Sequence, residues 1–304
     1  MKSASLNRRG VALMLVLWLI VVLGVLATAI AAAAHRDSTL TWNLRARATA
    51  RYAAESGVAV ATRHLEQLLQ AASSDDARAR TFQDVDRHFG ALRAVPIGAG
   101  RFGIAVIDLN ARIDLNRSDP SVLRSLFAQF TDPERAERAA AGLADWIDAD
   151  DVVRTGGAEL ADYVTMDSPY TPRNAPLDRL DDLAHVLQVG DALAAAVAPY
   201  VTVESDGLVN LNSASEPVLA ALPGIGVARA RDIVVRRTGG ETFTSPAALA
   251  DPGPAFALLA IMPSRLLIVS RGWLDGHPLT HEIQAVYGIA GPRLYLMTWR
   301  ERDL

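Results

Sequence analysis

The sequence has no cysteine among its 304 residues. Disulfide bonds, thiolate metal ligands and a cysteine nucleophile are therefore excluded, and an exported chain of this kind can fold without oxidation. The chain also lacks the basic excess of a general nucleic-acid binder. Its formal charge is −4, and setting aside the three basic residues Lys2, Arg8 and Arg9 leaves −7 for the remainder. Because phosphate binding needs a basic surface, this balance disfavours that class.

Charged side chains are absent from residues 11–34, where Thr28 is the one polar residue in a run of 24. A helix rises about 1.5 Å per residue, so this run can cross a bilayer core of about 30 Å. Lys2, Arg8 and Arg9 precede it, and basic residues hold a short N-terminus in the cytoplasm. We therefore expect a single membrane-spanning helix with the bulk of the chain outside the cytoplasm.

Three interpretations of this run remain open. A secretory signal would end at a small-residue cleavage site, which residues 31–34 could supply. A plain membrane anchor needs no processing. The third is a type IV prepilin-like leader: the tetrad Arg-Arg-Gly-Val at residues 8–11 resembles the site that a peptidase cuts on the cytoplasmic side. Gly10 would then end the leader and Val11 would begin the mature chain. Pilins usually carry Phe at that first position and Glu at the fifth, which is Leu15 here.

The helical pattern continues beyond the apolar run. Between residues 35 and 70 there is no proline, and the one glycine is Gly57. Apolar residues recur near a 3.6-residue period, which predicts one long helix whose upper half packs on a globular head. We expect this helix to end near residues 73–76, with a second helical piece at 77–89. Its small residues Ala46, Ala48, Ala50, Ala53 and Ala54 would let helices of neighbouring subunits approach closely.

Strand patterns bracket a long helical region. Residues 102–109 and 112–115 predict two strands, joined at Asn110-Ala111. Helical patterns follow from residue 119 to about residue 262. Three further strands are predicted at residues 265–270, 281–289 and 293–300, with apolar and polar residues alternating in the second. The order predicts an α+β chain in which a helical block interrupts a sheet.

The helical block contains a repeat. Asp114-Leu115-Asn116 and Asn210-Leu211-Asn212 lie 96 residues apart, and apolar residues of the helices that follow match at the same offset. Each copy predicts the end of a strand, a polar capping residue and a helix with periodic apolar residues. The repeat implies two related helical subdomains or one pseudo-symmetric unit.

The second copy continues into Leu-Pro-Gly-Ile-Gly at residues 222–226, which resembles a helix-hairpin-helix whose glycines permit a tight turn. Some such hairpins bind DNA through the turn's backbone amides and nearby basic residues, which here would be Arg229, Arg231, Arg236 and Arg237. Because the body of the chain is acidic and lies outside the cytoplasm, we favour a packing role over DNA binding.

We expect no catalytic activity. His277 and His281 are four residues apart with Glu282 beside the second, but the order is not the metalloprotease motif and the predicted turn favours a solvated loop.

Residues 145–162 carry six carboxylates, with Arg154 as the nearest cation. Like charges at this density repel one another unless something compensates, and carboxylate oxygens are ligands that Ca²⁺ prefers. Asp148, Asp150 and Glu159 match the first, third and twelfth positions of an EF-hand loop, but Val153 stands where that loop needs glycine. The segment is therefore not an EF-hand. It is either an acidic surface loop or a cation site of another design.

Taken in order, these motifs resemble minor pseudopilin K of type II secretion systems. The resemblance covers essentially the whole chain, and its specific pieces are short segments: residues 9–11, Leu15, 113–116, 145–150, 156–159, 174–177 and 209–226. It implies a type IV pilin-like fold with these parts: a leader at 1–10, a transmembrane helix at 11–34 and its periplasmic continuation at 35–90. The remaining parts of this fold would be the first strands of the sheet at 101–116, an all-α insertion at 117–263 and the last strands of the sheet at 264–304.

The resemblance also implies a function. Such a subunit sits in the bacterial inner membrane with its C-terminal domain in the periplasm, at the tip of a pseudopilus that helps export folded proteins. Its partners would be minor pseudopilins I and J, the major pseudopilin and the prepilin peptidase, with no nucleic acid. The helical domain of that family binds calcium, which here implies Asp148, Asp150, Asp151, Glu159 and Asp162 as ligands. The alternative is a membrane-anchored DNA-binding or DNA-uptake protein that uses the hairpin.

Overall fold

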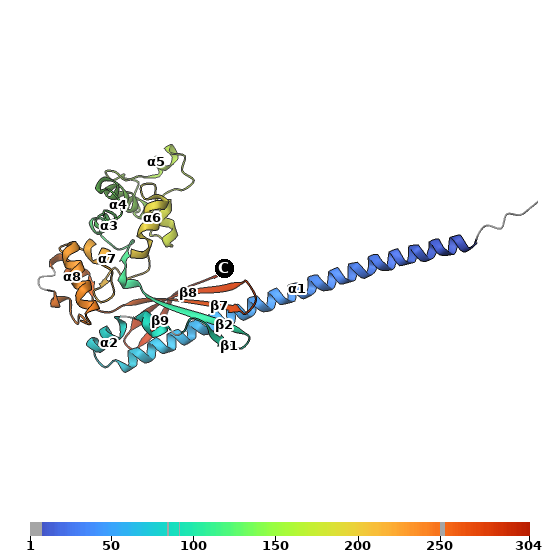
Figure 1. Ribbon diagram of the computed structural model, residues 1–304. Helices are drawn as coiled ribbons and strands as arrows, with labels where there is room; N and C mark the ends of the chain where they lie inside the picture. The colour runs from blue at the N-terminus through green and yellow to red at the C-terminus, as the bar shows by residue number, and fades with distance from the viewer. Residues whose placement is uncertain (1–7, 84, 91, 250–252) are drawn as a thin grey trace, which may run out of the picture.

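The computed structural model describes residues 8–83, 85–90, 92–249 and 253–304. Helix α1 (Arg8–Ala71) is 64 residues long, and its N-terminal half projects from the head as a free rod (Figure 1). Within the described part of the chain, it is the one helix long and apolar enough to cross a membrane. Gly10 and Val11 lie inside this helix, whereas residues 1–7 of the expected leader lie outside the described residues.

The C-terminal half of α1 packs on the sheet of the head. Its buried residues follow helical spacing from Ala46 to Leu69. The contact is close: a Cβ on Gly272 would come within 2.1 Å of the carbonyl oxygen of Ala50. The expectation that the alanines serve neighbouring helices is therefore wrong for four of them. Ala48 is exposed, but the others face the protein's own sheet, namely Ala46, Ala50, Ala53 and Ala54.

The long helix ends close to the expected residues 73–76, and the segment 35–90 also holds the separate helical piece expected at 77–89. Helix α1 ends at Ala71, and a separate helix α2 (Asp75–Phe82) begins after the N-cap Ser74, whose hydroxyl accepts a hydrogen bond from the Ala77 amide. A 3-10 turn η1 (Val85–Phe89) follows. The polar residues at 73–76 end the long helix because a serine cap and two aspartates favour a new helix start there.

A five-stranded antiparallel sheet has the order β1-β2-β7-β8-β9. Its strands are β1 (Val95–Ile97), β2 (Gly100–Asp108), β7 (Arg265–Leu274), β8 (Thr280–Ala290) and β9 (Arg293–Asp303). Strand β2 pairs with β7 along its whole length, although about 160 residues separate them. The insertion therefore enters at the end of one central strand and leaves at the start of its neighbour.

The expected hairpin of residues 102–115 is wrong. After β2 the chain turns through η2 (Leu109–Ala111), where the Asp108 side chain accepts a hydrogen bond from the Asn110 amide. It then leaves the sheet, and β3 (Ile113–Asp114) pairs in parallel with β4 (Val201–Thr202) instead. Only β2 of the span 101–116 therefore belongs to the main sheet.

The insertion is largely helical but not all-α. Besides β3 and β4 it contains a second parallel pair, β5 (Val209–Asn210) with β6 (Leu259–Ala260). Its first part holds α3 (Pro120–Phe127), α4 (Pro133–Ile147), α5 (Leu160–Thr165), η3 (Leu180–His185), α6 (Gly190–Val197) and η4 (Ala198–Tyr200). Its second part holds α7 (Glu216–Ala221), α8 (Gly226–Thr238), η5 (Pro246–Ala248) and η6 (Gly253–Leu258). These helices enclose a core separate from the one between α1 and the sheet.

The two parts repeat one hydrogen-bonded arrangement. The Asn116 side chain donates to the carbonyls of Leu177 and Val203 and accepts from the Leu177 amide. Asn212 makes the same three bonds, to the carbonyls of Phe243 and Ile261 and from the Phe243 amide. We call each asparagine with its partners a repeat frame. The strand, the frame asparagine and the start of the following helix recur at the offset of 96 residues seen in the sequence.

A polar junction fixes the insertion to the sheet. Asp108, at the end of β2, accepts hydrogen bonds from the side chains of Asn210 (2.7 Å) and Ser213 (2.5 Å) in the second repeat. Beside it, the side-chain amide of Asn110 donates to Asp206, and its oxygen accepts from the Ser264 amide at the entry to β7. Because these groups are buried or half-buried and mutually satisfied, they define the angle between the two cores.

Candidate functional site

An acidic loop (residues 145–162) connects α4 to α5 in the first repeat. Asp148 caps the C-terminus of α4, and Glu159 is the N-cap of α5. The loop folds back so that carboxylate oxygens of Asp148, Asp150 and Glu159 all lie within 4.8 Å of one another. These three residues form the carboxylate cluster, and it lies at the outer end of the insertion, far from α1 (Figure 1).

Glu159 is the most buried member of the cluster. Its exposed fraction is 3%, and neither carboxylate oxygen has a hydrogen-bond partner. One oxygen of Asp148 is also buried without a partner. Burial, with the charges of Asp145 and Asp148 next in size, raises the pKa of Glu159 to about 7. A buried carboxylate without donors or a counter-ion is costly, and no described side chain donates to Glu159 or forms an ion pair with it.

Arg154 compensates only the inner side of this loop. Its guanidinium binds the fully buried Asp145 at 2.8 Å and also contacts Asp148, while its backbone amide donates to Asp145. Gly157 lies against the same carboxylate, since a Cβ there would come within 1.9 Å of an Asp145 oxygen. One arginine therefore serves two carboxylates, and its hydrogen bonds and ion pairs within the described residues do not reach Asp150 or Glu159.

Two of the five expected ligands lie outside the cluster. An oxygen of Asp151 accepts from the Asn174 side chain at 3.1 Å. Asp162 accepts from the Glu159 amide at 3.0 Å and thereby completes the cap of α5. The spacing of three residues between Glu159 and Asp162 is that of an N-cap and its N3 partner, a signal in the sequence that favours a capping role for Asp162.

Of the histidine pair, His277 lies in the loop between β7 and β8 as expected, but His281 is not solvated. His281 lies at the start of β8 and is 6% exposed. Its ring nitrogens contact Asp303 at 2.6 Å and Glu301 at 3.2 Å, both on β9. His277 contacts Asn43 of α1 instead. The two histidines therefore bind different partners, and His281 joins the last two strands.

The hairpin of the second repeat joins α7 to α8, with Gly224 and Gly226 at positive φ angles of 81° and 68°. Its arginines are engaged within the chain. Arg231 binds Glu216 and Arg236 binds Glu241, while Arg229 donates to the carbonyl of Gly224. Arg237 is half-buried and donates to the carbonyls of Leu211 and Ala214. These contacts favour a packing role, because a phosphate would have to compete with each of them.

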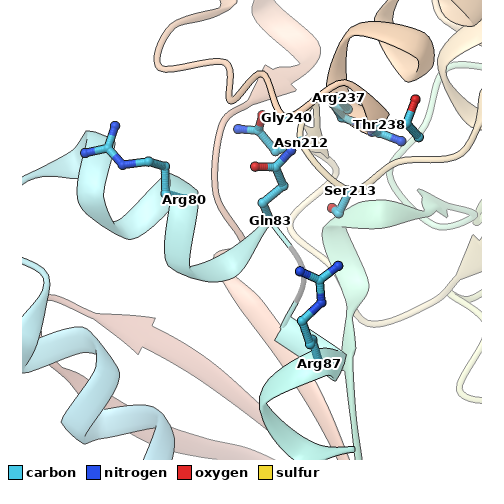
Figure 2. A pocket seen from close by; sticks show the side chains of 8 residues that line it. All are labelled: Arg80, Gln83, Arg87, Asn212, Ser213, Arg237, Thr238 and Gly240. Atoms are coloured by element: carbon cyan, nitrogen blue, oxygen red, sulfur yellow. The ribbon is translucent and has the colours of Figure 1, made fainter.

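A cavity of about 570 Å³ separates the second repeat from α2 and η1. Figure 2 shows the side chains that line it, with Arg87 pointing toward the space under Gln83 and Arg80 pointing away from the other labelled residues. Gln83 bridges the two sides, because it donates to the carbonyl of Glu241 and accepts from the Thr242 hydroxyl. The cavity is thus an open gap beside a structural contact.

The fold defines a class of protein: an α+β pilin-like chain with a long apolar N-terminal helix, an antiparallel sheet and a helical insertion. Residues 100–206 match the family model for type II secretion system protein K, first domain. Residues 204–251 match a helix-hairpin-helix motif, in agreement with the hairpin at residues 222–226. The family match covers β2 and the first repeat, and therefore includes the carboxylate cluster.

Two known proteins are similar. Type II secretion system protein K of Pectobacterium carotovorum subsp. carotovorum is 32% identical over 94 residues, which span 29% of this chain and 29% of that protein. A chain in the crystal structure of the GspK-GspI-GspJ complex from enterotoxigenic Escherichia coli superimposes with a TM-score of 0.64 at 16% identity. That superposition covers 88% of this chain and 99% of the other and shows a shared fold. The chain thus resembles protein K of the type II secretion system.

Proposed function

We propose that the chain is a minor pseudopilin of a type II secretion system, anchored in the inner membrane by α1 with its head in the periplasm. The observation that carries this is the combination of an apolar, exposed N-terminal half of α1 with a protein K-like domain in the head. The role is structural rather than enzymatic. The expected partners are minor pseudopilins I and J, the major pseudopilin and the prepilin peptidase, which would cut between Gly10 and Val11.

Two features support a position at the tip of the pseudopilus. The insertion stands off the end of the head that is remote from the membrane helix, where it would obstruct a subunit stacked above (Figure 1). Leu15 takes the place of the intramembrane Glu that pilins use to pair with a neighbour's amino terminus. A subunit at the end of the fibre has no such neighbour, so an apolar residue costs nothing there.

Processing and assembly test this role. The full chain, expressed with the prepilin peptidase and tagged minor pseudopilins I and J, should yield a mature N-terminus at Val11 by mass analysis and co-purify with both partners. Gly10→Leu should block cleavage, whereas Ser5→Ala in the leader should not. A mature chain that begins near His35 would contradict the proposal, since it would mean removal of the helix as a secretory signal.

We further propose that the carboxylate cluster binds Ca²⁺, with Asp148, Asp150 and Glu159 as its protein ligands. The unpartnered oxygens of Glu159 and Asp148 support this, because oxygen ligands without other donors suit a hard divalent cation. Asp151 and Asp162, which the resemblance also implies, would contribute only after their present hydrogen bonds are broken. When bound, the cation would neutralise the loop and hold it against α4.

DNA binding is the weaker alternative. A soluble head beginning at Arg36 should not bind duplex DNA at physiological salt, because the hairpin arginines are engaged and the body is acidic. Micromolar binding that falls steeply with salt and is lost in the Arg229→Gln, Arg231→Gln double variant would favour this alternative.

A further inference from the structure

A second cavity, of about 220 Å³, lies where the insertion meets the outer face of the sheet. It is lined by η2 and the residue after it, by the start of η3, by β4 and the residues that follow it, and by strands β7 to β9. Aliphatic side chains form much of its wall: Leu109, Leu180, Val201, Val203 and Leu267. The volume is small, so only a short group can enter.

Four arginines and two carboxylates also line this cavity. Both carboxylates already have a partner: Arg179 binds Asp181 at 2.8 Å, and Arg300 binds Glu204 at 3.0 Å. The third arginine, Arg302, turns to the buried Glu282 at 2.6 Å, which Arg271 also binds. Three of the four guanidinium groups are therefore paired.

Arg112 is the fourth arginine, and it differs from the others. It is half-buried, and within the described residues its side chain has neither a hydrogen bond nor an ion pair. Burial lowers the pKa of Arg112, and the one charge that counteracts this is Asp108. Asp108 itself is satisfied by Asn210 and Ser213. A half-buried guanidinium thus lines a partly open cavity without a partner among the described residues, and its burial is unfavourable unless a ligand supplies one.

We propose that this cavity binds a carboxylate carried on a short apolar stem, with Arg112 as the donor that binds it. A guanidinium offers two parallel N–H groups that match the two oxygens of a carboxylate. The aliphatic wall suits a stem of a few carbon atoms. A phosphate fits less well, because its second charge would need an arginine that is already paired. The carboxylate could belong to a free small acid or to a polypeptide, as a side chain or as a chain end.

Calorimetric titration of the full chain in detergent distinguishes these sources. The probes are sodium butyrate, a capped tripeptide with a central glutamate, and a tripeptide that ends in a free leucine carboxylate. Butyramide is the neutral control, and inorganic phosphate is the control for charge alone. At least one carboxylate probe should bind while butyramide and phosphate do not, and the strongest probe identifies the source.

Variants test the assigned residue. Arg112→Gln should weaken binding of that probe about tenfold or more, because the bidentate charge-assisted contact is lost. Arg112→Lys should bind that probe with an affinity between those of wild type and Arg112→Gln, since lysine keeps the charge but lacks the two parallel N–H groups. Arg124→Gln, on α3 and paired with Glu137 outside the cavity, should bind like wild type. Without ligand, Arg112→Gln should melt no lower than wild type, because no internal partner is lost.

Each of the opposite results overturns the proposal. These are no binding of any carboxylate probe, equal binding by wild type and Arg112→Gln, or phosphate binding as strong as that of the best carboxylate. A ligand-free Arg112→Gln chain that melts well below wild type would mean that Arg112 has a structural partner, and the proposal would fall. None of these outcomes depends on the pseudopilin role or on the calcium site.

Discussion

The two repeats of the insertion share a frame but differ in the chain that the frame holds. In the first, Asn116 binds Leu177, 61 residues further on, while in the second Asn212 binds Phe243 after only 31 residues. The longer excursion of the first repeat contains the acidic loop. What both copies contain serves the fold, whereas the loop that only one copy contains adds a carboxylate cluster with one buried member, Glu159.

The loops also differ in how their charges are compensated. In the second repeat Arg236 and Arg231 bind Glu241 and Glu216, so each of these charges has a partner. In the first, Arg154 contacts two carboxylates, and the Glu159 carboxylate has no hydrogen-bond donor in the described part of the chain. From this comparison we expect that substitution of the frame asparagine destabilises either repeat. Removal of a negative charge should stabilise only the first repeat.

Substitution of a frame asparagine should change the stability of the head more than any other variant considered below. Asn212→Ala removes three buried hydrogen bonds and should lower the free energy of unfolding by about 2–4 kcal/mol, and Asn116→Ala should cost somewhat less because its site is half-buried. Urea denaturation of the head measures this. Gln129→Ala, which removes an exposed side chain bonded to the Pro217 carbonyl, should cost less than about 0.5 kcal/mol. Equal effects of all three would show that the frames are not structural.

Gly157→Ala should come next, with a loss of about 1–3 kcal/mol, because its methyl group would collide with the buried Asp145 carboxylate. Gly90→Ala is the matched control, since the nearest atom to its added methyl would be 3.6 Å away. Thermal melts in calcium and in chelator measure both. If Gly157→Ala melts like wild type, the packing of the loop on Asp145 is not as described.

Glu159→Gln should stabilise the calcium-free head by about 1–3 kcal/mol at pH 7.5, because it removes a buried charge. The folded pKa of Glu159, about 7, lies above the ordinary value of 4.5. The folded state therefore holds this proton more tightly, so the cost is absent below about pH 4.5 and complete above about pH 7. Wild-type stability in chelator should fall across that window relative to Glu159→Gln.

The control for this prediction is a variant that removes one negative charge from an exposed position of the same helix–loop segment. Glu134→Gln removes one charge from the exposed face of α4 and should leave stability unchanged within about 0.5 kcal/mol. If both variants stabilise the head equally, the effect comes from net charge rather than from the buried position of Glu159.

The smallest change in stability is expected when an exposed ion pair of the second repeat is broken. Arg231→Gln breaks an exposed ion pair with Glu216, and such pairs contribute about 0–1 kcal/mol. Chemical denaturation should therefore show a change below about 0.5 kcal/mol. A larger loss would mean that the hairpin needs its charges for folding, and the contrast between the repeats would disappear.

Local pattern predicted the long helix, the last three strands and the repeat. Each depends on periodicity or caps within one segment. The hairpin at residues 102–115 was wrong because strand pairing is a long-range choice: β2 pairs with β7, and β3 pairs with β4. The match of Ile113-Asp114 with Val209-Asn210 at the repeat offset was the sequence signal against it, since equivalent segments should have equivalent partners.

The sequence predicted which segment forms the candidate site, but not every contact that its carboxylates make. Charge density identified the acidic loop, and Asp148, Asp150 and Glu159 do lie together. Sequence could not show that Asp151 binds the Asn174 side chain, because that depends on how the loop folds, whereas the three-residue spacing of Glu159 and Asp162 did indicate a cap. The unpaired state of Arg112 was likewise invisible, since its neighbours come from five separate segments.

Calcium titration of the head (from Arg36) by calorimetry tests the central claim most directly, namely that the first repeat adds a cation site to a frame that both repeats share. We predict binding to wild type and to Glu134→Gln, no detectable binding to the Asp150→Ala, Glu159→Ala double variant, and a melting temperature that rises with calcium only in the first two. Binding that persists in the double variant, or identical melting of wild type in millimolar calcium and in chelator, would contradict the account.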